Sequence, residues 1–245
     1  MTRSTGIETL RAARADVLAR IEGACHRAGR APDDVTLVAV SKTVDPERLR
    51  DAVAAGLTLL GENRVQEGAA KASQVPGATW HLVGPLQSNK ARRAVEVFDT
   101  IESVGSVALA GRLDRVVREL RGGARTSPYP ILLQVNVDAD PSKAGFAPAD
   151  LEDALGILAG LTSLEVRGLM TIGRLVAEPE AARPTFRALR ALSDRLRTRT
   201  STAAGPVLGP DLSMGMTDDF EVAVEEGATI VRVGRALFGE RPQQA

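Results

Sequence analysis

A lysine stands at the end of the first strongly apolar run in this chain. Residues 35–40 read Val-Thr-Leu-Val-Ala-Val, a composition typical of a buried strand, and Ser41 and Lys42 follow directly. At the end of a buried strand, partial desolvation favours the neutral amine of a lysine over its ammonium ion. The neutral amine is the form that adds to a carbonyl group to give a Schiff base. Lys42 is therefore a candidate for holding an aldehyde; the alternative is a lysine whose stem packs while its head reaches water.

Two segments in the last part of the sequence could bind a phosphate group. One carries the hydroxyls of Ser213 and Thr217 on either side of Gly215, and the other ends in Gly234 and Arg235. Glycine lets a backbone approach a phosphate closely, and the amides at a helix N-terminus attract it. Parallel barrels often bind phosphate with their last two strand-to-helix loops. Each segment taken alone is also typical of an ordinary turn.

Arg232 interrupts the apolar run 230–233. Because side chains alternate across a strand, its charge should point opposite to Val231 and Val233. A lone arginine in the mouth of a barrel needs an acceptor, which is either an acidic side chain or an atom of a ligand. A guanidinium that faces a pyridine nitrogen would keep that nitrogen unprotonated and make the ring a weaker electron sink.

Two further polar residues follow apolar runs or lie within them. Asn63 comes directly after Gly61 and Glu62, and it could either cap the next helix or donate a hydrogen bond to a ligand. His81 lies inside the run 79–83, where a hydrogen-bonded core histidine is favoured over a catalytic one.

These residues need elements that bring them together. Eight strand-like runs are expected, at 35–40, 57–60, 79–83, 100–101, 130–137, 164–170, 207–208 and 229–233. Helices should begin near Asp45, Asn63, Ser88, Ser106, Pro148, Glu178 and Asp218, after an amphipathic helix over residues 7–28. This alternation indicates an α/β fold with parallel strands and helical crossovers. A doubly wound open sheet gives the same local pattern. Eight units and an extra N-terminal helix favour a single (β/α)8 TIM-type barrel domain over residues 1–245, with residues 1–30 packed on it.

Composition argues against several classes of function. Lys plus Arg equals Asp plus Glu at 31 each and aromatic residues make up 3%, so no nucleic-acid surface is expected. The single Cys25 excludes an internal disulfide and a multi-cysteine metal site, and we expect no metal. No apolar run reaches the roughly 18 residues that span a bilayer, and residues 1–10 lack a signal-peptide pattern. A cytoplasmic protein without membrane contact is therefore expected.

The motifs occur together in a recognisable order along nearly the whole chain. They are residues 38–42 (VAVSK), 61–63 (GEN), 65–67 (VQE), 80–90 (WHLVGPLQSNK), 134–136 (QVN), 143–146 (KAGF), 168–173 (GLMTIG), 212–220 and 231–239. With these motifs the chain resembles the pyridoxal phosphate homeostasis proteins, cofactor-binding relatives of the barrel domain of alanine racemase.

The resemblance implies a set of binding residues for pyridoxal 5'-phosphate. Lys42 would carry the cofactor as a Schiff base, and Arg232 would lie near its ring nitrogen. The remaining implied contacts are Ser213, Thr217, Gly234 and Arg235 at the phosphate, Met214 in the same loop as Ser213, and Asn63, His81 and Met170 around the ring. The resemblance further implies a non-catalytic role in pyridoxal phosphate homeostasis, with apo-enzymes as possible recipients of the cofactor.

An amino-acid racemase that uses the same cofactor is the alternative. A racemase related to this barrel takes its second base, a tyrosine, from an additional domain and a partner subunit. No such domain follows before Ala245, and the single Tyr129 precedes the fifth expected strand, at the opposite end of the barrel. The carrier is therefore favoured, and a monomer is expected, although slow exchange on Lys42 alone stays open. A barrel enzyme that forms a Schiff base with a sugar is the weakest reading.

Two positions depart from the family's pattern. Arg64 stands where the family often has a tyrosine, and the loop 138–141 (DADP) replaces a turn that is usually rich in Gly and Glu. Both departures concern the mouth of the barrel rather than the implied phosphate site.

Overall fold

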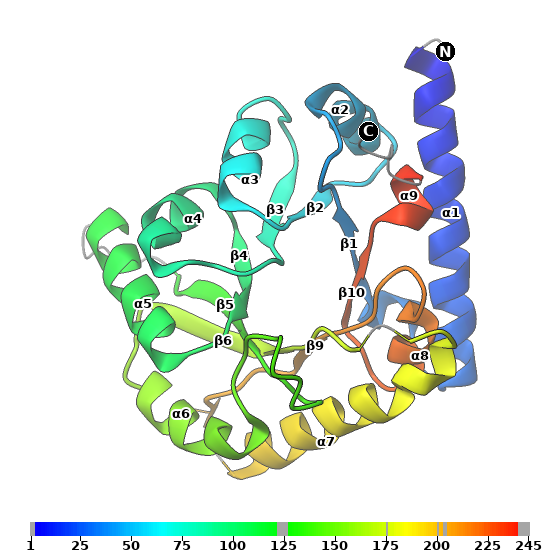
Figure 1. The fold of residues 1–245 in the computed structure, drawn as a ribbon. Helices are drawn as coiled ribbons and strands as arrows, with labels where there is room; N and C mark the ends of the chain where they lie inside the picture. Colours follow the sequence, from blue (N-terminus) through cyan, green and yellow to red (C-terminus); the bar gives the residue numbers. More distant parts are fainter. Residues whose placement is uncertain (1–2, 122–126, 175, 200, 203–204, 240–245) are drawn as a thin grey trace.

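The computed structural model describes residues 3–121, 127–174, 176–199, 201–202 and 205–239, and its core is a closed barrel of parallel strands. In the order around the barrel, the strands are β1 (Thr36–Val40), β10 (Ile230–Val233), β9 (Asp211–Ser213), β6 (Leu164–Met170), β5 (Tyr129–Gln134), β4 (Thr100–Val104), β3 (Thr79–Leu82) and β2 (Leu59–Glu62). Figure 1 looks into this barrel, with the helices arranged around it. The predicted eight-stranded α/β barrel is confirmed.

The helices follow the strands as the alternation predicts. They are α1 (Arg3–Arg27), α2 (Pro46–Ala54), α3 (Val65–Ala72), α4 (Ala91–Val97), α5 (Val107–Arg121), α6 (Leu151–Leu158), α7 (Arg183–Arg199), α8 (Phe220–Glu225) and α9 (Arg235–Phe238). Short 3-10 turns lie at η1 (Pro32–Asp34), η2 (Ser88–Lys90), η3 (Pro148–Asp150) and η4 (Pro179–Ala182). The N-terminal helix α1 buries Leu10, Val17 and Ile21 and packs against α2, α8 and α9. In the part of the chain that the structure describes, no helix has the length and apolarity needed to cross a membrane.

The seventh strand is not where the apolar pattern predicted it. The expected strand at 207–208 is wrong, because Leu208 is buried in the core without entering the barrel, and β9 begins at Asp211. Close backbone contact determines the position of β9. A Cβ atom on Gly168 would lie 1.9 Å from the carbonyl oxygen of Asp211, and one on Gly209 would lie 2.4 Å from that of Arg167. Upstream, β7 (Ser201–Thr202) pairs antiparallel with β8 (Gly205–Pro206) outside the barrel.

The strands divide their side chains between two environments. A small apolar cluster fills the barrel interior and consists of Val38, Val83, Leu132, Met170 and Ile230. A larger cluster joins the outer faces of the strands to the helices, and Val231 and Val233 belong to it. Arg232 therefore points into the barrel, as the strand alternation predicts.

Candidate functional site

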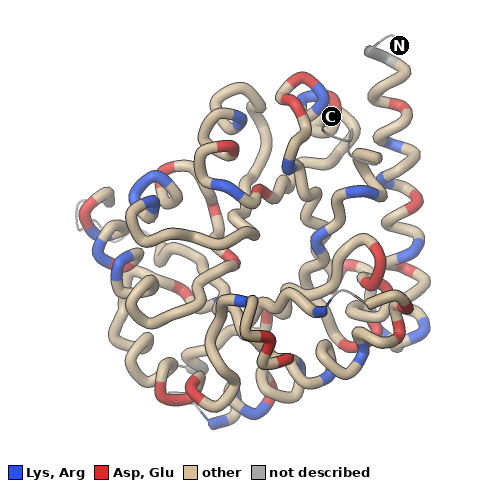
Figure 2. The backbone as a smooth tube through the Cα atoms, in the orientation of Figure 1, with Lys and Arg blue, Asp and Glu red and all other residues tan. Residues whose placement is uncertain are grey.

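One cavity of about 640 Å³ opens at the carboxyl ends of the barrel strands. Its lining residues are Val40, Lys42, Asn63, Val83, Gly84, Pro85, Ile172, Met216, Thr217, Asp218, Arg232, Gly234 and Arg235. Six of the ten residues named from the sequence thus meet around one space: Lys42, Asn63, Thr217, Arg232, Gly234 and Arg235. Figure 2 shows basic positions from several elements around the centre of the barrel.

Lys42 reaches this cavity from the loop that follows β1. The strand alternates strictly, so that Val38 and Val40 face the barrel interior and Ala39 faces the helices. Lys42 continues the inward series and is half-buried, with Ser41 fully buried behind it. The next residue, Thr43, has a φ of +66°, in the left-handed region that a β-branched residue rarely adopts.

Three groups from the loops after β9 and β10 meet at one side of the cavity. The backbone N–H of Gly234 donates to Oγ1 of Thr217 at 3.3 Å, and Arg235 begins the short helix α9. Arg235 also pairs with Asp218 at the cavity rim. A hydroxyl, a backbone amide and a guanidinium within one small region can bind a phosphate group.

Arg232 lies at the base of the cavity and is 4% exposed. Its Nη1 donates to Oγ of Ser213 at 2.6 Å and its Nη2 to the carbonyl oxygen of Thr171 at 2.8 Å. Burial lowers the pKa of the Arg232 guanidinium, and the negative charges of Glu102 and Asp219 oppose this shift. The acceptors in the protein are therefore a hydroxyl and a backbone carbonyl rather than the acidic side chain expected, and Glu102 supplies a negative charge nearby. The same side chain still borders the cavity.

Glu102 connects His81 to Arg232 inside the barrel. Its Oε1 lies 2.7 Å from Nδ1 of His81, and its Oε2 accepts a hydrogen bond of 2.5 Å from Oγ of Ser213. Burial raises the pKa of Glu102, but the hydrogen bonds from His81 and Ser213 and the charge of Arg232 hold it below its ordinary value. Sequence reasoning missed Glu102 because the fourth strand was expected to end at Ile101. The sequence signal for Glu102 was a charge inside an apolar strand, the same signal that pointed to Arg232.

The other four predicted residues lie outside the cavity lining. His81 and Ser213 belong to the buried network around Glu102. Met170 is fully buried and packs in the barrel interior with Val83, which itself lines the cavity. Met214 is fully buried in the outer apolar cluster.

Gly215 packs closely against α8. Its φ is +89°, and a Cβ atom there would lie 2.5 Å from Cβ of Ala223 and 2.9 Å from Cα of Phe220. The missing side chain thus allows the loop to contact α8, and the expected part of Gly215 in phosphate binding stays a prediction. Asn63 does not cap the next helix, since α3 has no side-chain cap.

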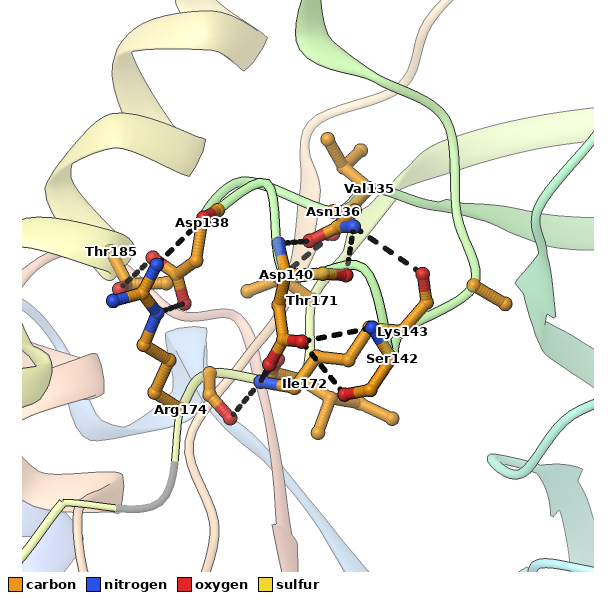
Figure 3. Close-up of polar contacts among 12 residues, drawn as sticks. Val135, Asn136, Asp138, Asp140, Ser142, Lys143, Thr171, Ile172, Arg174 and Thr185 are labelled. Atoms are coloured by element: carbon orange, nitrogen blue, oxygen red, sulfur yellow. Dashed lines mark hydrogen bonds and ion pairs between the residues drawn. The ribbon is translucent and has the colours of Figure 1, made fainter.

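The segment 136–143, which contains the loop 138–141, is tied to the loop after β6, where Arg174 also donates to the carbonyl oxygen of Asp138 at 2.9 Å (Figure 3). Asn136 holds the turn by donating from Nδ2 to the carbonyl oxygen of Asp140 at 2.8 Å, and Lys143 donates to the carbonyl oxygens of Ile172 and Gly173 at 3.1 and 2.8 Å. Because Ile172 lines the cavity, this loop supports one of its walls. Among the residues described, no group of three or more His, Cys, Asp or Glu side chains is arranged to hold a metal ion.

Comparison with known proteins identifies the family of this chain. The family described as alanine racemase, N-terminal domain, matches residues 18–242. The pyridoxal phosphate homeostasis protein of Aquifex aeolicus is 40% identical over 227 residues, which cover 92% of this chain and 95% of that protein. The homologue of the same name from Pseudomonas aeruginosa is 42% identical over 229 residues, covering 93% and 94%. This chain belongs to the pyridoxal phosphate homeostasis protein family.

Solved structures place this family member among close and distant relatives. A protein of unknown function from Bifidobacterium adolescentis aligns with a TM-score of 0.84 at 36% identity, covering 97% of this chain and 98% of that one. PipY of Synechococcus elongatus, solved with pyridoxal phosphate bound, aligns with a TM-score of 0.76 at 42% identity, covering 90% and 100%. Alanine racemase of Clostridium difficile is 15% identical with a TM-score of 0.67, covering 94% of this chain and 61% of that one, and it shares the fold.

Proposed function

We propose that this protein binds pyridoxal 5'-phosphate in the 640 Å³ cavity, holds it covalently through the amine of Lys42, and serves as a carrier in pyridoxal phosphate homeostasis. The observation that carries the proposal is the convergence of an amine, a phosphate-binding group and a buried guanidinium on one cavity. The binding of pyridoxal phosphate by PipY, a relative at 42% identity, supports the same conclusion.

The residues present fit the chemistry of this cofactor. Pyridoxal phosphate supplies an aldehyde that reacts reversibly with a primary amine. Thr217, Gly234 and Arg235 would hold the phosphate, and Lys42 would supply the amine. Arg232 would donate a hydrogen bond to the ring nitrogen, and its fixed contacts to Ser213 and Thr171 leave its direction little freedom.

Two features favour a carrier over a racemase. A guanidinium cannot give up its proton at neutral pH, so Arg232 would leave the ring nitrogen unprotonated and would weaken any carbanion formed on the substrate. The single tyrosine of the chain is also far from the chemistry, since Tyr129 begins β5 at the amino end of the barrel and its hydroxyl donates to the carbonyl oxygen of Phe98 at 2.6 Å. Both features support a protein without substantial turnover of its own.

The decisive test is an absorbance spectrum of the purified protein with added cofactor. We expect a visible band from the covalent adduct, which Lys42→Ala abolishes and which the control Lys90→Ala, on η2 outside the cavity lining, retains. A full band in Lys42→Ala would contradict the assignment of Lys42. Chiral analysis after incubation with D- or L-alanine separates the two functions, because rapid interconversion would favour the racemase.

The proposed role also implies recipients for the cofactor. We propose that a cytoplasmic, monomeric carrier passes pyridoxal phosphate to apo-enzymes. Mixing the loaded protein with an apo-aminotransferase should restore transaminase activity faster than simple dissociation allows, and size-exclusion chromatography with light scattering should give the mass of one chain. Restoration at the dissociation rate would contradict direct transfer.

A further inference from the structure

A buried ion pair lies directly behind Lys42, on the outer side of the barrel wall. Lys71 of α3 donates from Nζ to Oε1 of Glu62 at 2.6 Å and to the carbonyl oxygen of Ser41 at 2.8 Å. The hydroxyl of Ser41 donates to the same Glu62 oxygen at 2.7 Å. Glu62 and Ser41 are fully buried, and Lys71 is 8% exposed. The two charges therefore converge on the residue that precedes Lys42.

This arrangement is costly for an apolar layer. Removing two charges from water is expensive, and well-packed apolar residues often replace a buried ion pair with no loss of stability. One oxygen of the pair, Oε2 of Glu62, is buried without a hydrogen-bond partner among the residues described. Stability of the fold is thus a poor explanation for the pair. Apart from each other, Lys71 and Glu62 contact the backbone carbonyl and the hydroxyl of Ser41.

Ser41 begins a tight turn that contains Lys42. The N–H of Val44 donates to the carbonyl oxygen of Ser41 at 3.1 Å, the oxygen that also accepts from Lys71. Between them lie Lys42 and Thr43, and Thr43 has the unfavourable φ of +66°. A β-branched residue keeps such a conformation only where its surroundings impose it. The ammonium of Lys71 is one constraint from outside the turn.

We propose that Lys71, neutralised by Glu62, is a positioning residue: it fixes the turn 41–44 and thereby directs the amine of Lys42 into the cavity. Lys71 is not one of the residues that line the cavity. The inference rests on the proposed function in one respect, that Lys42 is the residue that holds the cofactor.

The test removes both charges together, because Lys71→Met alone would leave Glu62 buried and unpaired. The variant is Glu62→Gln combined with Lys71→Met. The matched control is Val75→Ala, which removes buried apolar volume just after α3, at a residue with no hydrogen bond to Ser41. A low concentration of urea is added to the more stable variant, so that the two variants are compared at the same free energy of unfolding.

The first measurement uses the protein without cofactor. Amide hydrogen exchange of Val44, followed by NMR, reports the turn itself, and we expect exchange about tenfold faster in the double variant and unchanged in the control. The second measurement is the affinity for pyridoxal phosphate and the pH profile of the visible band. We expect about tenfold weaker binding and a displaced pH midpoint in the double variant, because a misdirected amine reacts less favourably.

The outcomes separate the two proposals. Wild-type exchange at Val44 together with a wild-type pH profile would overturn the role of Lys71. A wild-type protein that forms no visible band would overturn the proposed function, while exchange at Val44 would still test the turn. If the double variant does not fold, Glu62→Leu combined with Lys71→Met replaces it, which again removes both charges. Faster Val44 exchange in this variant supports the proposal, and wild-type exchange contradicts it.

Discussion

The two sides of the barrel are held together by different means. On the β5–β6 side, backbone pairing runs through six positions, from Tyr129 with Leu164 to Gln134 with Met170. On the β9–β10 side, β9 has three residues and the pairing register joins Ile230 to Ser213. There, side chains add to the backbone hydrogen bonds of Met214 with Ile230 and of Arg232 with Gly215. Arg232 donates to Ser213, and Ser213 donates to Glu102 across the interior.

This difference shows where the molecule concentrates its polar chemistry. The long pairing of β5 with β6 joins mostly apolar residues, although its register shifts between Ile131 and Leu132. The short strands β9 and β10 leave room for loops that contribute most of the proposed phosphate and ring contacts. Functional groups thus lie where the strands are shortest.

The strongest test of the comparison removes the buried guanidinium. Arg232→Met should destabilise the protein by about 3–5 kcal/mol, because Glu102 would stay buried without its nearby positive charge. Urea unfolding followed by circular dichroism measures this change. The control Arg93→Ala breaks an exposed ion pair with Glu96 and should cost at most about 1 kcal/mol. A loss for Arg232→Met as small as the control's would mean that the β9–β10 side does not depend on its polar network.

A second test concerns the loop that connects β9 to α8. Gly215→Ala should cost about 3 kcal/mol, since the new Cβ meets Cβ of Ala223 at 2.5 Å and φ is +89°. Gly111 in α5 is the matched control, because nothing lies within 4 Å of a Cβ there, and Gly111→Ala should stabilise the helix by up to about 1 kcal/mol. Thermal unfolding of both variants checks the contrast. Equal effects would show that the loop can adjust without its close contact.

Acid should lower the free energy of unfolding through protonation of Glu102. Burial raises its pKa, but its hydrogen bonds and Arg232 hold the folded-state pKa below the unfolded value of about 4.3. Glu102 therefore stabilises the folded state above that value, and this contribution is lost as pH falls towards the lower folded pKa. The free energy of unfolding between pH 3 and 7 should depend less on pH in Glu102→Gln than in the wild type. Asp211 and Asp219, whose pKa values burial raises, act in the opposite direction. The contribution of Asp219 is common to both proteins, whereas Glu102→Gln also removes one of the charges that raise the pKa of Asp211; burial, the main cause of that shift, is unchanged. Identical pH slopes would contradict this role.

The smallest expected effect lies at the end of β1. Thr43→Gly should stabilise the protein without cofactor by about 1 kcal/mol, because relief of the strain at φ +66° exceeds the entropy that glycine adds to the unfolded chain. Thr36→Gly at the exposed start of β1 is the control and should cost about 0.5–1 kcal/mol. Urea unfolding of the two variants measures the difference, and a destabilised Thr43→Gly would show that the turn carries no strain.

The sequence allowed the fold and part of the candidate site to be predicted. Strand alternation predicted that Arg232 points inward, because period two is a local property of any strand. A charge inside a strand also marks Glu102. It was missed because the apolar run ended at Ile101, whereas β4 continues to Val104. The position of β9 was not predicted, because close backbone contacts at Gly168 and Gly209 set it rather than an apolar pattern. Lys71 could not be predicted at all, since its contact with Ser41 depends on how α3 packs against the barrel.

Closure of the barrel has a consequence for the order in which this protein can assemble. β1, which leads to Lys42, pairs with β10, the last strand of the barrel, from Thr36 with Ile230 to Ala39 with Val233. During synthesis the first strand must therefore wait until residues 230–233 have been made before its second edge is covered. The proposed cofactor site, which needs groups from both strands, is completed only at that last step. A nascent chain on the ribosome would thus bind no cofactor before it has folded.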